Sequence, residues 1–377
     1  MKRLLALVGA IVFVDTMFFT ALTPLLPHYA DRFELTKLGA GVLSAAYPAG
    51  ALAGGLPSGI ATARLGPRAT VVGGLLLMAG TTLAFGLADS IAVLDAARFA
   101  QGLASACAWT GGLAWLVGAA PSARRGELIG TAMAAAIVGA LFGPVIGWVG
   151  SAAGTGAVFG SVGGVALILA AWAATSQRPT GHDSQPLRAL LEALRSPGVQ
   201  AGIWFVVLPA LLFGTLSVLA PLRLHELGGG SLLIGGAYLV AAAFEAVVNP
   251  LLGRLSDRRG RILPIRASLL ASALVASLLT WPDDRFVVAG LVIAAGVAFG
   301  SFWSPAMSHL ADAAEARGLG YGFTFALMNT AWAPGQALGS VGSGALADAT
   351  SDAVPYLLLA SICLLTFAAL WRSRGSS

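Results

Sequence analysis

The chain has 377 residues, of which 57% are hydrophobic and only 10% are charged, and its mean hydropathy is +0.83. Soluble domains carry about 25% charged residues, so this composition excludes an ordinary soluble domain and indicates an integral membrane protein. The net charge is +5, but the basic residues cluster between apolar runs, which indicates membrane topology rather than nucleic-acid binding.

Twelve segments are long and apolar enough to cross a bilayer, since a crossing helix needs about 20 residues. The sequence therefore predicts an all-α polytopic membrane protein with twelve transmembrane helices in two six-helix, pseudo-symmetric bundles. The expected spans are 4–28, 38–61, 69–88, 91–117, 128–151, 154–175, 199–224, 231–253, 263–281, 286–310, 319–346 and 353–371.

Lysine and arginine predict the orientation of these spans. With the N-terminus in the cytoplasm, 17 of the 22 basic residues fall in cytoplasmic segments and four fall outside. Cytoplasmic loops carry the excess of positive charge, so both termini are expected in the cytoplasm. A single polytopic chain without a targeting segment predicts the inner (plasma) membrane of a bacterium.

The first expected span contains an acidic residue, Asp15, within an otherwise apolar stretch from Leu4 to Pro27. A carboxylate at that depth costs about 2.5–3.5 kcal/mol on insertion scales. We therefore expect Asp15 to bind a proton or a solute. Phe18, on the same span, is a candidate for lining a substrate cavity.

The fourth expected span carries Arg98-Phe-Ala-Gln101-Gly102. Arg98 lies roughly 12 Å into the helix at 1.5 Å per residue. Either Arg98 and Gln101 face the cavity, where Arg98 influences proton exchange, or Arg98 forms a structural ion pair with Asp95, three residues earlier.

A second intramembrane acid, Glu245, lies in the eighth expected span, with Asn249 one turn later. No basic residue is near it in sequence, so Glu245 is protonated, paired across the bundle, or facing water. We expect it to face the cavity. The further cavity candidates, whose alternative role is packing, are Trp303, Asn329, Trp332 and Gln336.

The chain divides into two halves that resemble one another. A polar linker with a short amphipathic helix, residues 176–197, separates an N-terminal bundle (1–175) from a C-terminal bundle (198–377). At a constant offset of 194, Pro27 pairs with Pro221, Arg64 with Arg258 and Trp109 with Trp303. Two parallel six-helix repeats are a transporter architecture, with the substrate near the midplane between them.

Three glycine-containing motifs lie in or next to the expected spans. The loop after the eighth span reads Gly253-Arg-Leu-Ser-Asp257-Arg258-Arg-Gly260-Arg261, the loop after the second reads Gly59-Ile-Ala-Thr-Ala63-Arg64-Leu-Gly66-Pro67-Arg68, and the fifth span contains Gly139-Ala-Leu-Phe-Gly143-Pro144-Val-Ile-Gly147.

Over essentially its whole length, the chain resembles the major facilitator superfamily. The loop after span 8 is similar to the superfamily's G-x-L-A-D-R-x-G-R loop, where Asp and Arg tie helix ends together and glycines permit the turn. The first copy departs from that pattern, because Ala63 replaces the Asp and Pro67 replaces an Arg. The resemblance implies that both loops are gating motifs.

The remaining motifs indicate which branch of the superfamily the chain resembles. Span 4 is similar to the R-x-x-Q-G pattern, and span 5 is similar to G-x-x-x-G-P-x-x-G, which in the superfamily is associated with proton antiporters. Span 1 resembles that of the twelve-helix drug:proton antiporters and the related vesicular amine transporters, whose first span carries an acid comparable to Asp15.

These features predict a secondary active transporter that exchanges protons for small lipophilic or cationic compounds. The alternative is a proton-coupled symporter, or a uniporter or exporter, of a neutral metabolite such as a sugar or amino acid. The chain lacks the H-E-x-x-H and G-x-S-x-G motifs, so an enzyme is not expected. The expected partners are the substrate, protons and the lipid bilayer; no nucleic acid, cofactor or metal is expected, and the protein is expected to be a monomer.

Overall fold

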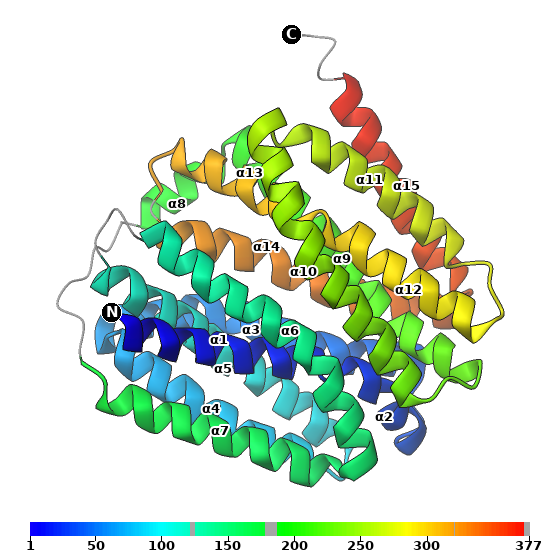
Figure 1. Cartoon of the computed structure of the whole chain (residues 1–377), viewed down its shortest axis with the longest axis horizontal. Helices are drawn as coiled ribbons and strands as arrows, with labels where there is room; N and C mark the ends of the chain where they lie inside the picture. Colours follow the sequence, from blue (N-terminus) through cyan, green and yellow to red (C-terminus); the bar gives the residue numbers. More distant parts are fainter. Residues whose placement is uncertain (121–124, 178–186, 320, 373–377) are drawn as a thin grey trace. The chain divides into compact units, whose positions relative to one another are not determined.

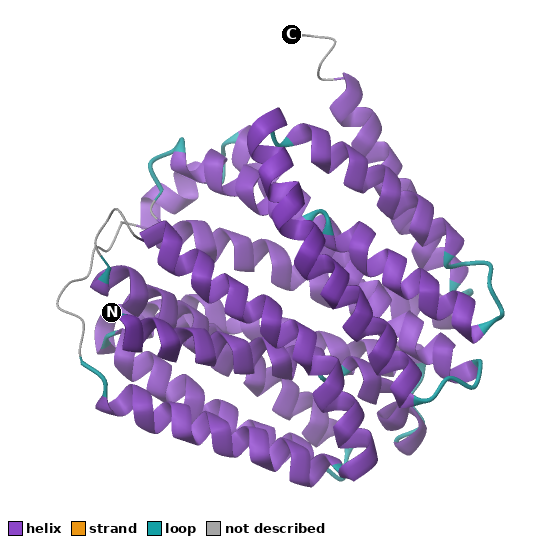
Figure 2. Ribbon diagram, in the orientation of Figure 1, coloured by secondary structure: helices purple, strands orange, loops and turns teal. Residues whose placement is uncertain are grey.

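In the computed structural model, residues 1–120, 125–177, 187–319 and 321–372 are described (Figure 1). Helices make up nearly all of these residues, and no strand occurs among them (Figure 2). The helices are α1 (Lys2–Thr20), η1 (Thr23–Leu25), α2 (Leu26–Arg32), α3 (Lys37–Leu65), α4 (Pro67–Gly86), α5 (Ile91–Ala119), α6 (Arg125–Ala153), α7 (Thr155–Thr175), α8 (Leu187–Ala193), α9 (Pro197–Glu226), α10 (Ser231–Arg259), α11 (Ile262–Leu278), α12 (Arg285–Gly300), α13 (Trp303–Glu315), α14 (Tyr321–Ala349) and α15 (Ala353–Arg372).

Within the described ranges, nine helical segments are long and apolar enough to cross a membrane. They are Lys2–Arg32, Pro67–Gly86, Ile91–Ala119, Glu127–Ala153, Thr155–Thr175, Pro197–Glu226, Ser231–Arg259, Arg285–Glu315 and Ala353–Arg372. Helices suit a bilayer because they satisfy every backbone hydrogen bond internally. The predicted all-helical, multi-pass class is confirmed, whereas the count of twelve spans and the pseudo-symmetry stay predictions.

Two of the expected spans are interrupted, and a proline lies close to each interruption. Proline lacks an N–H, and its ring clashes with the carbonyl four residues earlier. Pro24 stands four residues after Thr20, where α1 ends, and Pro305 stands four residues after Ser301, between α12 and α13. Each of these spans is therefore built from separate helical pieces.

Contacts divide the chain into two compact units. The first contains Met1–Leu25, Ala46–Leu190 and Leu319–Ala333, and the second contains Leu26–Ala45, Leu191–Gly318 and Pro334–Ser377. Both α3 and α14 contribute residues to each unit. The predicted bundles 1–175 and 198–377 stay a prediction; part of the predicted linker, residues 178–186, lies outside the described residues, and α8 is the short helix in its described part.

Glycines allow close helix packing inside each unit. In the first unit, a Cβ atom at Gly139 or Gly143 of α6 would overlap the backbone of α1 at Phe13 or Met17. In the second unit, α14 packs against α9 in the same way. A Cβ atom at Gly335 would overlap the backbone of Val207, and one at Gly339 would overlap the backbone of Leu211. The α9 positions follow the α1 positions by 194 residues, and the α14 glycines follow the α6 glycines by 196.

Candidate functional site

The carboxylate of Asp15 lies at the centre of a polar cluster in the first unit. Tyr47 of α3 donates its hydroxyl to Oδ1 at 2.8 Å. Ser105 and Trp109 of α5 donate to Oδ2 at 2.9 and 2.7 Å. Asp15 is only 4% exposed, so these three donors replace the water that the charge loses on burial.

Helix geometry explains why these donors converge. Ser105 and Trp109 are four residues apart and therefore lie on the same face of α5. A Cβ atom at Gly102 would overlap the backbone oxygen of Tyr47, so only glycine permits this approach between α5 and α3. The close contact brings the Tyr47 side chain within reach of Asp15.

A buried guanidinium lies next to this cluster. Arg98 is 1% exposed and donates to the carbonyl oxygens of Phe19 at 3.2 Å and Phe18 at 3.5 Å. Both carbonyls belong to the last turn of α1, where backbone oxygens lack helical partners and the helix dipole favours a cation. The Arg98 guanidinium also lies 4.9 Å from the centre of the Tyr47 ring.

Tyr47 therefore links the two buried charges, because its hydroxyl contacts Asp15 and its ring faces Arg98. Opposite charges on Asp15 and Arg98 also attract each other directly. Gln101 accepts from Arg98 at 3.3 Å and donates to the Thr81 carbonyl at 3.2 Å, which extends the cluster to α4. The first unit thus holds a connected polar network across four helices.

The alternative pairing of Arg98 with Asp95 is not supported at Oδ1 of the Asp95 carboxylate. Oδ1 of Asp95 is inaccessible to water and makes no hydrogen bond to any described residue. Arg98 directs the hydrogen bonds described above toward α1 and Gln101.

The second acid has a poorer set of partners. Glu245 of α10 accepts one hydrogen bond, from the Asn249 amide at 3.3 Å. A Cβ atom at Gly300 would lie 2.5 Å from the Glu245 carboxyl carbon, so the acid packs against the last residue of α12. Oδ1 of Asn249 is buried and has no hydrogen-bond partner among the described residues. Glu245 and Asn249 therefore lie beside the interruption between α12 and α13.

The aromatic cavity candidates make contacts within their own units. Phe18 is 1% exposed and packs edge-on against Phe159, with ring centres 5.2 Å apart. Trp303 stacks on Phe213 at 6.1 Å. Trp332 packs edge-on against Phe19 at 5.4 Å.

The polar candidates on α14 differ in exposure. Gln336 is 5% exposed, and its backbone oxygen accepts from Ser340 at 3.0 Å. Asn329 is exposed. The cavity role of these side chains and of the aromatic ones stays a prediction.

The loop after α10 forms a charged junction inside the second unit. Arg261 donates to Asp312 of α13 at 2.9 Å and also pairs with Asp257 at the end of α10. The hydrogen bond to Asp312, with the neighbouring Asp257, raises the pKa of the Arg261 guanidinium above its usual range. Gly260 has φ +84°, a left-handed conformation that favours glycine. Arg258 is exposed, and Gly253 lies close to Ser304.

The loop after α3 has the same backbone turn with different side-chain contacts. Gly66 has φ +87°, and Arg68 donates to the carbonyl oxygen of Ser176 at 2.9 Å. Arg64 is exposed, and Gly59 has open space where a Cβ atom would lie. Pro144 and Gly147 lie inside α6, which continues to Ala153.

Sequence reasoning did not identify three residues that complete the Asp15 site, namely Tyr47, Ser105 and Trp109. In the sequence, Trp109 stands out only as one member of a repeated Trp pair. Hydroxyl and indole groups are common in membrane helices, and their convergence on one carboxylate depends on the packing of three helices. Among the described residues, no group of three or more His, Cys, Asp or Glu side chains could hold a metal ion.

Long apolar helices that bury charged clusters define a multi-pass membrane protein. The sequence profile described as Major Facilitator Superfamily matches residues 8–333. The chain belongs to this superfamily and is, by family and fold, a secondary transporter.

Individual relatives agree with this assignment. An uncharacterized MFS-type transporter, YcaD of Shigella flexneri serotype 5b (strain 8401), is 23% identical over 96% of this chain and 93% of its own length. The MFS-type transporter ppzB of Metarhizium rileyi (strain RCEF 4871) is 31% identical over 34% of this chain, but the match spans only 28% of that relative.

A solved structure shares the fold. The crystal structure of a bacterial homologue of the human lysosomal transporter Spinster, in an inward-facing and unoccupied conformation, superposes with a TM-score of 0.76. The superposition covers 92% of this chain and 82% of that chain at 17% sequence identity.

Proposed function

We propose that this transporter exports small lipophilic or cationic compounds in exchange for protons, by alternating access between two halves of six helices each. It would act as a monomer in the plasma membrane, with both termini in the cytoplasm. The observation that carries the proposal is that each compact unit holds an acidic residue near the middle of a transmembrane span, Asp15 within Lys2–Arg32 in the first unit and Glu245 within Ser231–Arg259 in the second. The Gly-Pro motif of α6 adds support by its resemblance to antiporter sequences.

The two acids have different surroundings, and this difference supports different roles. Three donors and a nearby guanidinium compensate the charge of Asp15. Among the described residues, Glu245 has a single donor, the Asn249 amide. A charge within a membrane protein is costly unless it is paired, so the partly buried Glu245 carboxylate has the stronger need for a proton or a cation.

Competition at Glu245 provides a mechanism for exchange. A cation and a proton can each compensate this carboxylate, but the neutral acid loses its attraction for the cation. Proton uptake on one side of the membrane would therefore release the substrate there, and proton loss on the other side would prepare the site for the next cation. Asp15, Arg98 and Gln101 would keep a fixed polar environment in the first unit.

A neutral substrate is the competing proposal, and one observation favours it. The hydrogen bonds of Asp15 are already supplied by Tyr47, Ser105 and Trp109, so this acid does not require a cationic substrate. In that case a sugar or amino acid would bind by hydrogen bonds. Its transport would either follow protons in the same direction (symport) or be uncoupled from protons.

Proteoliposomes with an imposed pH gradient distinguish these proposals. We expect wild-type protein to drive uphill movement of tetraphenylphosphonium, with proton flux in the opposite direction reported by trapped pyranine. Glu245→Gln should abolish uphill movement, while Asp95→Asn, a matched change of another partly buried membrane acid, should retain it. Uphill transport at the wild-type rate by Glu245→Gln would disprove the role of Glu245. Gradient-independent transport, or movement of glucose or alanine but not the cation, would favour the alternative.

A further inference from the structure

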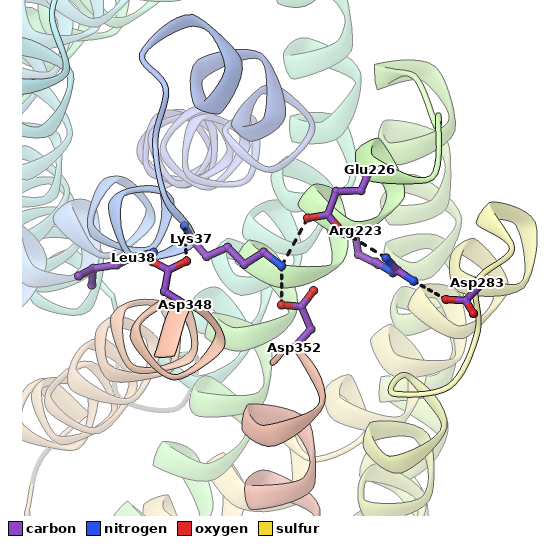
Figure 3. A network of polar contacts seen from close by, with 7 residues as sticks. All are labelled: Lys37, Leu38, Arg223, Glu226, Asp283, Asp348 and Asp352. Atoms are coloured by element: carbon purple, nitrogen blue, oxygen red, sulfur yellow. Dashed lines mark hydrogen bonds and ion pairs between the residues drawn. The ribbon is translucent and has the colours of Figure 1, made fainter. Parts of the chain in front are cut away.

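A network of charged residues joins several helix ends in the second unit (Figure 3). At its centre, Nζ of Lys37 lies 2.6 Å from Asp352 at the start of α15 and 3.4 Å from Glu226 at the end of α9. Glu226 also pairs with Arg223 at 3.4 Å, and Arg223 pairs with Asp283 at 2.5 Å. We call these residues, together with Asp348, the Lys37 network.

The network also caps the first turn of α3. Asp348, near the end of α14, accepts hydrogen bonds from the backbone N–H groups of Lys37 at 3.1 Å and Leu38 at 2.8 Å. The first N–H groups of a helix lack partners within the helix, and a carboxylate there also interacts favourably with the helix dipole. The beginning of α3 is therefore anchored through its backbone as well as through its side chain.

Next to the Lys37 network, the backbones of α3 and α14 pack closely against each other. A Cβ atom at Gly41 would lie 2.5 Å from the carbonyl oxygen of Ser340, and one at Gly344 would overlap the backbone of Lys37. Reciprocal glycines let α3 and α14 approach without interlocking large side chains. Such a surface can close tightly and separate without displacing interdigitated side chains.

The anchored segment belongs to one unit while the rest of its helix belongs to the other. Leu26–Ala45 falls in the second unit, whereas α3 from Ala46 onward falls in the first. Asp31 of α2, in the same segment, also pairs with His225 of α9 at 2.9 Å. The segment is thus held to the second unit at two places along its length.

The exposure of the network suits contacts that form and break. The side chains of Lys37 and Asp352 are 25% and 26% exposed, and that of Glu226 is 44% exposed. Water can solvate these charges when the pairs separate, so the opening cost is far below that of a fully buried ion pair.

We propose that the Lys37 network is a conformational latch that holds residues 26–45 on the second unit and closes this end of the transporter. Opening of the substrate path at this end requires Lys37 to leave Asp352 and Glu226, so that residues 26–45 can separate from α9, α14 and α15. The latch goes beyond the proposed antiport, because it applies whichever substrate or ion is carried.

Cysteine accessibility tests the latch without knowledge of the substrate. Ala40 lies on the anchored segment and is 0% exposed. Ala40→Cys would be introduced after replacing the native Cys107 and Cys363 with alanine, and its reaction with a charged maleimide would be followed in nanodiscs. We expect Lys37→Met to raise the labelling rate about fivefold, the size expected from losing two partly exposed ion pairs. The capping of α3 by Asp348 should remain, since it uses backbone N–H groups.

Three variants make the result specific. Asp352→Asn should also raise the labelling rate, and the exchange Lys37→Asp with Asp352→Lys should restore it toward the wild-type value. Arg285→Met is the matched control, because Arg285 donates to the Gly228 carbonyl at 2.9 Å and is outside the network. Unchanged labelling in both Lys37→Met and Asp352→Asn would overturn the proposal, as would an equal increase in Arg285→Met.

Discussion

At the scale of single residues, the two membrane acids differ in how completely their charges are compensated. Asp15 receives three hydrogen bonds, and Glu245 receives one. In an apolar bilayer this difference matters, because an uncompensated charge must acquire a proton, a cation or water. This difference is the basis for proposing ion exchange at Glu245 and a fixed polar environment at Asp15.

Removing one donor from Asp15 should destabilise the protein measurably. Tyr47→Phe deletes a hydrogen bond to a buried charged group, and we expect a loss of about 1.5–3 kcal/mol in unfolding free energy. Tyr238→Phe is the control, since Tyr238 donates to the neutral carbonyl of Leu216 at 2.7 Å, and its loss should be about 0.5–1.5 kcal/mol. Denaturant titration in detergent measures both. Equal losses, or no coupling between Tyr47→Phe and Asp15→Asn in a double-mutant cycle, would contradict this account of the cluster.

The charge on Lys37 predicts how the latch responds to pH. Partial burial opposes the charged form, but the hydrogen bond to Asp352 and the charges of Asp352 and Glu226 outweigh it and raise the pKa of Lys37 above 10.5. A raised pKa in the folded state adds stability that is complete below pH 10.5 and is lost as pH rises through the folded-state value.

Among the described residues, Lys37 contacts the charged groups of Asp348, Asp352 and Glu226, and Glu226 in turn pairs with Arg223. We expect the difference in melting temperature between wild type and Lys37→Met to be constant from about pH 7 to 10 and to shrink above that range. A difference that disappears between pH 7 and 9 would show that Lys37 is not held in its charged form by these partners.

At the scale of helices, both units place glycines against a neighbouring helix at matching positions. Gly102 approaches Tyr47 in the first unit, and Gly296 approaches Ala241 in the second, with both members displaced by 194 residues. Gly66 and Gly260, also 194 residues apart, have nearly equal φ values of +87° and +84°. These correspondences support the internal repeat predicted from the sequence, which stays a prediction.

Filling one of these close contacts should weaken helix packing. Gly143→Ala places a Cβ atom against the carbonyl oxygen of Met17 and the Thr20 side chain, and we expect a loss of about 1–3 kcal/mol from overpacking. Gly164→Ala in α7 meets open space and should be neutral or stabilising by up to about 1 kcal/mol, because alanine favours the helix. Thermal unfolding of the two variants side by side measures the difference. A stable Gly143→Ala protein would mean that α1 and α6 can separate at little cost.

At the scale of the whole molecule, hydropathy and basic-residue placement are enough to predict a multi-pass helical protein, since the bilayer imposes those patterns locally. The turn at Gly260 and the acids at positions 15 and 245 could also be recognised locally. Contacts between distant segments could not be recognised from the sequence. Lys37 and Asp352 are 315 positions apart, and nothing near Lys37 in sequence indicates that partner. The same holds for the donors around Asp15, whose positions depend on helix packing.

The proposed division between coupling and gating predicts two distinct transport defects. A one-for-one exchange of a proton for a monovalent cation can support an about tenfold substrate gradient per pH unit. Lys37→Met should change the initial rate but preserve this steady-state ratio, because the latch alters the populations of states and leaves the exchanging carboxylate intact. Glu245→Gln should abolish accumulation yet allow downhill flux, because its neutral amide cannot exchange protons. Measuring rate and accumulation of tetraphenylphosphonium in the same proteoliposomes separates these effects. A lowered accumulation ratio in Lys37→Met, at an unchanged passive leak, would show that the Lys37 network also takes part in coupling.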